Sequence, residues 1–309
     1  MNFSSLHEKL FYEALRIRRA EERVIQIYPT DRIQSPVHLS IGQEAVAVGV
    51  CHPLRTEDPL FGSYRSHAFF LAKGGTMREM FAELYGKATG GSGGKAGSMH
   101  LTAPEAGFMG SSAVVASTIP NAVGAALAAK RRGTGQVVVT VFGDGATEEG
   151  VYHESLNFAA LHELPVLFLC ENNGLAVHSK LGDRQAYGIC EHAAAYGIAT
   201  ERCREGWDFV RVSEVVSRIT EEIRNGAGPR FIECDTYRYQ EHVGIGCDHD
   251  VGFRNRADLE EWQKNDPLLH DEALLATFDP EIQAEIDDAV DFAEQSPWPG
   301  PEHLLADVA

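Results

Sequence analysis

VVVTVFGDGATEEGVYHESLNFAALHELPVLFLCENN, residues 137–173, is the stretch of sequence that decides the fold. Two short apolar runs in it, 137–142 and 166–170, are typical of buried strands. Between them lie a glycine turn at 143–145 and a helical pattern over 148–161. A strand, a turn, a helix and a second strand in this order predict two parallel strands joined by a crossover helix.

A carboxylate, Asp144, lies inside this glycine turn. Such a turn points free backbone N–H groups and the positive end of the following helix at an anion such as a diphosphate. Because Asp144 would repel that anion, we expect a divalent cation between the two. Asn173 follows the second strand, and the carboxyl ends of parallel strands meet where open α/β sheets bind ligands. Mg²⁺ prefers oxygen ligands, so we expect it to be held by the side chains of Asp144 and Asn173 and the carbonyl oxygen of Leu175.

Strand and helix patterns alternate along the rest of the chain. Helical periodicity covers 6–28, 43–50, 77–85, 119–130, 148–161, 212–223 and 280–294, and strand-like runs cover 137–142, 166–170, 209–212 and 231–236. This alternation predicts an α/β fold, a doubly wound and mostly parallel sheet with helices on both faces. We expect one domain over residues 1–309, with an N-terminal helical segment (about 1–30) and a C-terminal helical tail (about 266–309) that packs against a neighbouring subunit.

Composition limits the classes of partner. The chain has 309 residues and a formal net charge of −18, which disfavours nucleic acid and an anionic membrane surface as binding partners. It has no run of 18 apolar residues, and its N-terminus is a charged amphipathic pattern without an apolar signal core. We therefore expect a soluble, cytoplasmic protein. Six cysteines without a C-x-x-C pair indicate neither a disulfide framework nor a zinc site.

Four further motifs join G-D-G and N-N in a resemblance to a known family. They are HLSIGQEAVAVG at 38–49, YRSH at 64–67, GGKAGSMH at 93–100 and TYRYQEH at 236–242. In this order and spacing they resemble the alpha subunits of the thiamine-diphosphate-dependent decarboxylating component of 2-oxo acid dehydrogenase complexes, the pyruvate, branched-chain and acetoin types. The resemblance covers about residues 8–265. It implies the thiamine-diphosphate-binding fold of the diphosphate-binding type, with thiamine diphosphate and Mg²⁺ as cofactors.

The resemblance also implies which residues bind the cofactor. The diphosphate is expected to meet the backbone of the glycine turn and a tyrosine–arginine pair, namely Gly143, Asp144, Gly145, Ala146, Tyr64 and Arg65. A tyrosine hydroxyl and a guanidinium fork both donate to phosphate oxygens. The aminopyrimidine ring is expected to meet main-chain groups of Ala113 and Val115, although small residues at 113–117 also fit simple tight packing.

Three residues match catalytic positions of the family. His242 lies in the motif of the active-site loop, where a histidine is expected near C2 of the thiazolium and can move a proton or hydrogen-bond the reacting carbonyl. Arg238 belongs to the same loop, and His38 matches a histidine on the phosphate or substrate side. The alternative for each is a structural role, which is the commoner one for a single histidine or arginine.

One group that thiamine-diphosphate chemistry needs is missing from the chain. A glutamate must contact the pyrimidine ring, and in single-chain members it comes from a second α/β domain for which 309 residues leave no room. Glu44 is better explained by the start of a helix. The resemblance therefore implies a beta subunit that supplies the glutamate, in an alpha2-beta2 assembly, and a lipoyl-bearing acyltransferase that accepts the acyl group after decarboxylation of a 2-oxo acid or cleavage of acetoin.

The active-site loop departs from the family, since Val243 replaces a serine and the usual downstream Asp-Pro is absent. An alternative reading is therefore a split transketolase-like or acyloin-forming thiamine-diphosphate enzyme. A non-catalytic paralogue is a second alternative, and it conflicts with the presence of Asp144 and Asn173. An NAD-binding protein is disfavoured because the run from Gly143 lacks the third glycine of G-x-G-x-x-G.

Overall fold

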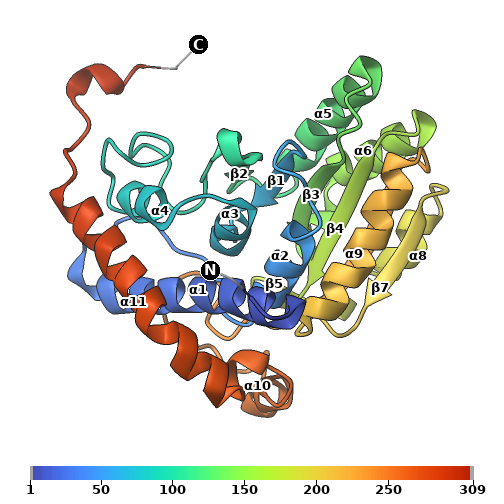
Figure 1. Cartoon of the computed structure of the whole chain (residues 1–309). Helices are drawn as coiled ribbons and strands as arrows, with labels where there is room; N and C mark the ends of the chain where they lie inside the picture. The colour runs from blue at the N-terminus through green and yellow to red at the C-terminus, as the bar shows by residue number, and fades with distance from the viewer. Residues whose placement is uncertain (1–2, 307–309) are drawn as a thin grey trace.

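A six-stranded parallel sheet forms the centre of the molecule. The computed structural model describes residues 3–306, and its strands follow the order β2-β1-β3-β4-β8-β7, each paired parallel to its neighbour (Figure 1). The doubly wound α/β fold predicted from the sequence is confirmed. The strands are β1 Leu60–Ser63, β2 Phe108–Ser112, β3 Val138–Gly143, β4 Val166–Asn172, β7 Ala199–Cys203 and β8 Arg230–Asp235, and a separate hairpin pairs β5 Leu175–Ala176 with β6 Ser179–Lys180.

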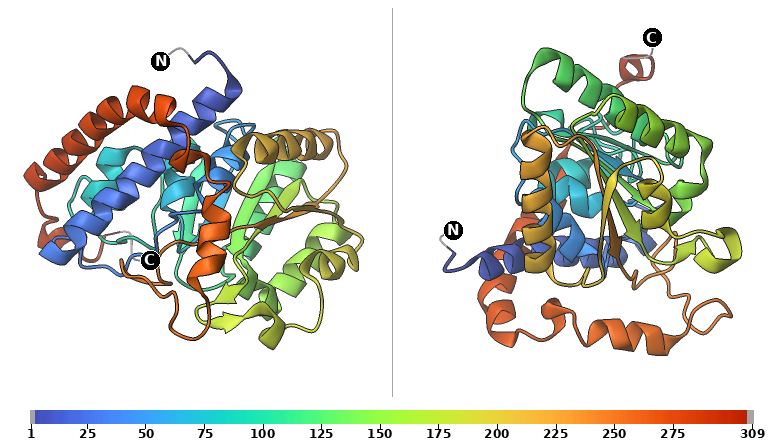
Figure 2. Two further views of the ribbon diagram at one scale, coloured as in Figure 1. Left: turned by 90° about the horizontal axis from the view of Figure 1, so that it is seen from below. Right: turned by 90° about the vertical axis from the view of Figure 1, so that its right-hand side faces the viewer.

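Helices cover both faces of the sheet because the buried strands are apolar on both sides. Along β3, Val139 and Val141 pack into one apolar core, whereas Val138 and Phe142 pack into the other. The first core contains α1 Leu6–Ile27, α2 Glu44–Cys51, α3 His67–Lys73, α4 Met77–Leu84, α9 Phe209–Arg224 and α11 Glu272–Gln295, and the second contains α5 Thr118–Arg132, α6 Gly150–Leu161 and α8 Ile189–Ala194. The second view of Figure 2 shows α9 and α8 on opposite sides of the sheet.

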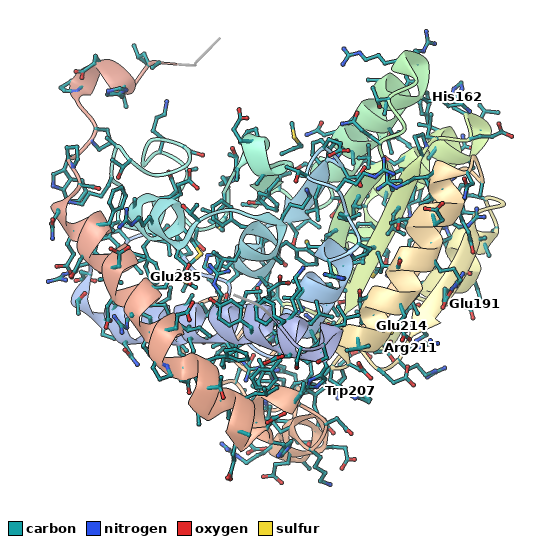
Figure 3. All side chains as sticks on the ribbon, in the orientation of Figure 1. His162, Glu191, Trp207, Arg211, Glu214 and Glu285 are labelled. Carbon is teal, nitrogen blue, oxygen red and sulfur yellow. The ribbon has the colours of Figure 1, made fainter. Side chains whose placement is uncertain are left out.

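The first and last long helices of the chain, α1 and α11, lie together. Helix α11 packs along α1 and α4, as the first view of Figure 2 shows for α1. Arginines of α1 pair with acids of α11, for example Arg16 with Glu285, which Figure 3 labels, and Arg19 with Asp279. The predicted helical tail is therefore present and packs on its own chain. Its contact with a neighbouring subunit stays a prediction, as does the single-domain organisation.

Some predicted elements are wrong or incomplete. The strand predicted over 209–212 is instead the first turn of α9, whose N-cap Asp208 accepts hydrogen bonds from the N–H groups of Val210 (3.0 Å) and Arg211 (2.9 Å). Strands β1, β2 and β7, which are short or polar, were not predicted. Helix α10 Arg256–Gln263 follows the loop 236–255, which we call the active-site loop. Its Trp262 packs edge-on against Trp207, which Figure 3 labels, with the ring centroids 4.8 Å apart. Within residues 3–306, no helix is both long and apolar enough to cross a membrane.

Candidate active site

A cavity of about 270 Å³ lies at the carboxyl ends of β3 and β4. Parallel strands of an α/β sheet place their ligands at this edge. The lining comes from the ends of β1, β3 and β4, the loop before α5, the β5 strand and the active-site loop. It includes Gln43, Tyr64, Arg65, Val115, Ala116, Gly143, Asp144, Gly145, Ala146, Glu148, Glu149, Glu171, Asn173, Leu175, Val177 and His242.

The three predicted metal ligands meet in this cavity. Gly143 at the end of β3 pairs in register with Glu171 of β4, which brings the turn containing Asp144 beside the turn containing Asn173. Burial raises the pKa of Asp144, and the backbone N–H of Asn173, which faces its carboxylate, is one of the groups that oppose this rise. The side-chain oxygen of Asn173 also accepts from the N–H of Leu175 at 3.0 Å, which fixes the turn between the two residues.

Asn172, the residue before Asn173, makes its hydrogen bonds inside the protein. Asn172 donates to Glu233 at 2.8 Å, and its side-chain oxygen accepts from the N–H of Gly174 at 2.9 Å. Both ends of its amide are therefore engaged inside the protein. This leaves Asn173, the second asparagine of the pair, as the one that lines the cavity.

The carboxylate of Asp144 is buried at 1% exposure, and it is paired with a residue that the sequence did not indicate. Burial raises the pKa of Asp144, and the guanidinium of Arg184, whose Nη2 lies 2.5 Å from Oδ2, opposes that rise. Arg184 ends the short helix α7 Leu181–Arg184 after the β5–β6 hairpin. Because Arg184 lies 40 positions from Asp144 in the chain, the sequence gives no sign of their contact.

Tyr64 and Arg65 reach the cavity, but Arg65 is already partly engaged. Its Nη1 donates to the carbonyl oxygen of Leu39 at 2.6 Å and its Nη2 to that of His242 at 3.0 Å. Burial lowers the pKa of Arg65 without neutralising it. Arg65 therefore brings positive charge to the cavity and also anchors the active-site loop at His242.

His38, Tyr64 and His242 form an aromatic cluster at the cavity. The ring centroids of Tyr64 lie 4.5 Å from His38 and 5.7 Å from His242, and the two histidine rings are 5.2 Å apart. Burial, with Arg65 adding to it, lowers the pKa of His242 to about 4 and that of His38 to about 3. Both imidazoles are therefore neutral at pH 7 and able to accept a proton.

The structure brings His242 into the cavity lining, whereas His38 lies behind Tyr64 and is not part of it. The Nδ1 atom of His38 is buried and has no hydrogen-bond partner among the described residues. The active-site loop is held beside His38 by the N–H of Gly244, which donates to the carbonyl oxygen of Val37 at 2.8 Å.

Two further predicted site residues, besides His38, lie outside the cavity lining. Arg238 is buried inside the active-site loop, where Nη1 donates to Gln240 at 2.6 Å and to Asp248 at 2.8 Å, and it lies outside the cavity lining. Its Nη2 donates to the carbonyl oxygen of Val177 at 3.2 Å, and its Nε has no hydrogen-bond partner among the described residues. Arg238 therefore helps to hold the loop, and its catalytic role stays a prediction. Ala113 is likewise outside the lining, while Val115 and the adjacent Ala116 are part of it.

Gln43 and Glu171 are among the lining residues that sequence reasoning missed. Glu171 is buried beside Gln43, whose Nε2 lies 3.3 Å from its carboxyl group, and burial raises its pKa to about 8. Its position at the end of a fully apolar strand is the one signal that could have indicated it. Glu44, by contrast, forms a buried ion pair with Arg18 and accepts from the N–H of Gly42 at 2.9 Å. A structural part for Glu44 is therefore confirmed.

The chain matches one protein family over most of its length. The family model "Dehydrogenase E1 component" matches residues 12–302. The chain belongs to the dehydrogenase E1 component family. This confirms the resemblance carried by G-D-G and N-N, and it makes the chain a dehydrogenase component of a family that uses thiamine diphosphate.

Relatives within the family match nearly the whole chain. The alpha subunit of acetoin:2,6-dichlorophenolindophenol oxidoreductase from Bacillus subtilis is 36% identical over 97% of this chain and 92% of its own. The pyruvate dehydrogenase E1 alpha subunit of Zymomonas mobilis is 35% identical over 97% of this chain and 87% of its own. An X-ray structure described as a thiamin diphosphate-dependent enzyme from Mycobacterium smegmatis overlaps 66% of this chain and 33% of its own, at 19% identity and a TM-score of 0.44. That overlap is too partial to add to the assignment.

Proposed function

We propose that this E1 chain is the alpha subunit of a heteromeric 2-oxo acid dehydrogenase component that decarboxylates a 2-oxo acid, or cleaves acetoin, and transfers the acyl unit to a lipoyl group. The observation that carries the proposal is the convergence of Asp144 and Asn173 on one cavity at the carboxyl ends of β3 and β4. The relatives named as alpha subunits of pyruvate and acetoin enzymes support the same reaction class.

The cavity residues fit a magnesium-bound diphosphate. Asp144 and Asn173 offer a carboxylate and an amide oxygen, and the backbone carbonyl of Leu175 belongs to the same lining. The backbone of Gly143, Gly145 and Ala146, with Tyr64 and Arg65, would hold the diphosphate, and Val115 with Ala116 would face the pyrimidine side. Bound thiamine diphosphate would supply the carbanion and act as the electron sink for loss of CO₂.

The residues of the chain orient the reactants and move protons. His242 reaches the cavity as a neutral imidazole, so it can accept a proton and return it to the reacting carbonyl or to a sulfur of the lipoyl group. His38 and Tyr64 pack against it and fix the orientation of its ring. Arg65 donates to the backbone carbonyl oxygen of His242, so one residue would both bind the diphosphate and hold His242 in place.

A beta subunit is part of the proposal because apolar side chains are exposed at the cavity. Val114, Val115 and Val177 belong to its lining, and Val243 follows the lining residue His242. Exposed apolar patches around a site mark a partner surface. The beta subunit would cover them and supply the glutamate that contacts the pyrimidine, giving an alpha2-beta2 assembly that docks a lipoyl-bearing acyltransferase. The free thiols of all six cysteines suit the reducing cytoplasm.

Calorimetric titration of the co-purified alpha–beta assembly with thiamine diphosphate, with and without Mg²⁺, tests the cofactor site. We expect binding that depends on Mg²⁺ and is lost in Asp144→Asn, while circular dichroism shows that the fold is retained, although loss of the buried pair with Arg184 lowers the melting temperature. Asn172→Ala is the control and should keep Mg²⁺-dependent binding, since Asn172 is engaged with Glu233 and Gly174 outside the metal set. Binding that ignores both Mg²⁺ and Asp144→Asn would refute the metal assignment.

Acylation of a lipoyl domain, measured by mass spectrometry with pyruvate, a branched-chain 2-oxo acid or acetoin as donor, tests the reaction. An artificial electron acceptor serves as a control for the oxidative half of the reaction. We expect the lipoyl domain to gain an acyl group from one of these donors. Ketol or acyloin formation without lipoyl acylation would instead favour the transketolase-like alternative.

A further inference from the structure

Arg184 holds the proposed metal-binding carboxylate from outside the cavity. Its Nη2 lies 2.5 Å from Oδ2 of Asp144, its Nη1 pairs with Glu148, and its Nε donates to the carbonyl oxygen of Ser179 at 3.2 Å. Asp144 and Glu148 both line the cavity, whereas Arg184 does not. The guanidinium therefore reaches two cavity acids from the side away from the space that a ligand would fill.

The residues after Arg184 strengthen this contact. Gln185 donates from Nε2 to the hydroxyl of Thr147 and, at 3.2 Å, to Glu148. The hydroxyl of Tyr187 donates to the carbonyl oxygen of Thr147 at 3.2 Å. Residues 184–187 thus fasten onto the 144–148 turn at several points, and we call this group of contacts the turn clamp.

The charges in the cavity explain why such a clamp is needed. Acids in the lining are Asp144, Glu148, Glu149 and Glu171, and Arg65 is its one arginine. A diphosphate adds further negative charge to this cavity. Arg184 pairs with two of these acids, Asp144 and Glu148, without being part of the cavity lining.

We propose that Arg184 is a positioning residue for the metal site: it holds one oxygen of Asp144 and fixes the orientation of the carboxylate, so that the other oxygen serves Mg²⁺. The inference rests on the proposed function. A ligating carboxylate that is itself hydrogen-bonded binds metal more tightly, and loss of such a partner typically costs about 10- to 100-fold in metal affinity. The opposite view, that Arg184 competes with the cation for Asp144, predicts tighter metal binding when Arg184 is removed.

The test uses the alpha–beta assembly with saturating thiamine diphosphate and measures the Mg²⁺ dissociation constant by calorimetry. In Arg184→Gln we expect Mg²⁺ to bind about 10- to 100-fold more weakly. Arg184→Lys should recover part of this loss, because it restores the charge but not the two-pronged fork. In turnover assays, the Mg²⁺ concentration for half-maximal rate should rise while the rate at saturating Mg²⁺ changes little.

Arg224 provides a matched control. Its side chain is 11% exposed and pairs with Asp58, which is fully buried, just as Arg184 is 11% exposed and pairs with Asp144 at 1%. The Arg224 pair lies at the end of α9, away from the cavity. Arg224→Gln should therefore lower the melting temperature and leave the Mg²⁺ dissociation constant unchanged.

The outcomes separate the inference from the function on which it rests. If the parent assembly shows no Mg²⁺-dependent cofactor binding, the proposed function fails. If the parent binds and Asp144→Asn does not, but Arg184→Gln binds Mg²⁺ as tightly as the parent or more tightly, the function stands and the positioning inference is overturned. The inference is likewise overturned if Arg184→Gln and Arg224→Gln weaken Mg²⁺ binding equally, since the effect would then come from stability alone.

Discussion

Glu44→Gln separates a structural glutamate from a catalytic one. Glu44 stands at the start of α2 in a motif of the E1 family, and a glutamate is what the chemistry of thiamine diphosphate requires. In the structure, however, both of its oxygens contact Arg18, and one also accepts from the N–H of Gly42. Arg18 is buried as well, and its Nη2 binds Asp266 at 2.9 Å. We expect the substitution to reduce stability and to spare the chemistry.

The size of the effect follows from this network. Removing one partner of a buried ion pair costs about 3–5 kcal/mol, because the other charge is left buried. Glutamine keeps an oxygen for Gly42 and for one bond to Arg18, and Asp266 still balances the guanidinium, so we expect the lower end, about 3 kcal/mol. For a chain larger than 250 residues, each kcal/mol lowers the melting temperature by about 2 °C, so the expected fall is about 6 °C.

Differential scanning calorimetry of the alpha–beta assembly and turnover at 25 °C give the two measurements. The expected result is a lower melting temperature with a turnover number within about twofold of the parent. Glu44→Asp is a useful companion, since it keeps the charge but shortens the reach to Arg18. Loss of activity at 25 °C with an unchanged melting temperature would refute the reasoning and would make Glu44 the catalytic glutamate.

Three further predictions follow from individual residues. The pKa of His242 is lowered to about 4, below its unfolded value near 6.5, so its contribution to stability is present above pH 6.5 and is lost as the pH falls to 4. In urea denaturation, the free energy of unfolding of His242→Gln should therefore fall less between pH 6.5 and 4 than that of the parent. Cys247 is exposed, whereas Cys190 is half-buried and the other four cysteines are buried, so iodoacetamide should modify Cys247 first, and earlier modification of a buried cysteine by mass spectrometry would contradict this. A Cβ on Gly206 would meet the carbonyl oxygen of Asp235 at 1.9 Å, so Gly206→Ala should destabilise the chain by at least about 1–3 kcal/mol, and an unchanged urea midpoint would contradict this steric argument.

The sequence predicts those parts of the fold whose signals are local. β3 and β4 are apolar on both faces and long enough to be distinguished from loops, so both were predicted to within two residues at each end. β7, with the sequence ATERC, is an edge strand with mostly exposed or half-exposed residues, so its composition does not indicate a strand. Its backbone is held in the sheet by parallel pairing with β8. The run 209–212 has a strand-like composition, yet the N-cap at Asp208 starts a helix there.

The sequence predicts that Asp144 and Asn173 meet, because each of them follows one of two adjacent strands. Asp144 and Asn173 are separated by one crossover helix, and the topology of parallel strands then brings them to one edge. Arg184 could not be predicted in this way, because its contact with Asp144 depends on the path of the β5–β6 hairpin and of α7. The strands of the hairpin are two residues long and α7 has four residues, which is too short for a sequence pattern. Arg238 was placed by motif alone, and motif position does not state where a side chain points.

The charges of the cavity lining favour a cation as the partner of a bound diphosphate. Burial raises the pKa of Glu171 to about 8, so that this acid is neutral at pH 7, and the lining also contains Asp144, Glu148 and Glu149. Arg65 and, from outside, Arg184 roughly balance them before a diphosphate arrives. Two further negative charges in a partly buried space would then be unfavourable by Coulomb repulsion, which water screens poorly there. A divalent cation on Asp144 removes that repulsion, so the acid in the turn raises affinity for a metal-bound diphosphate and lowers it for a metal-free one.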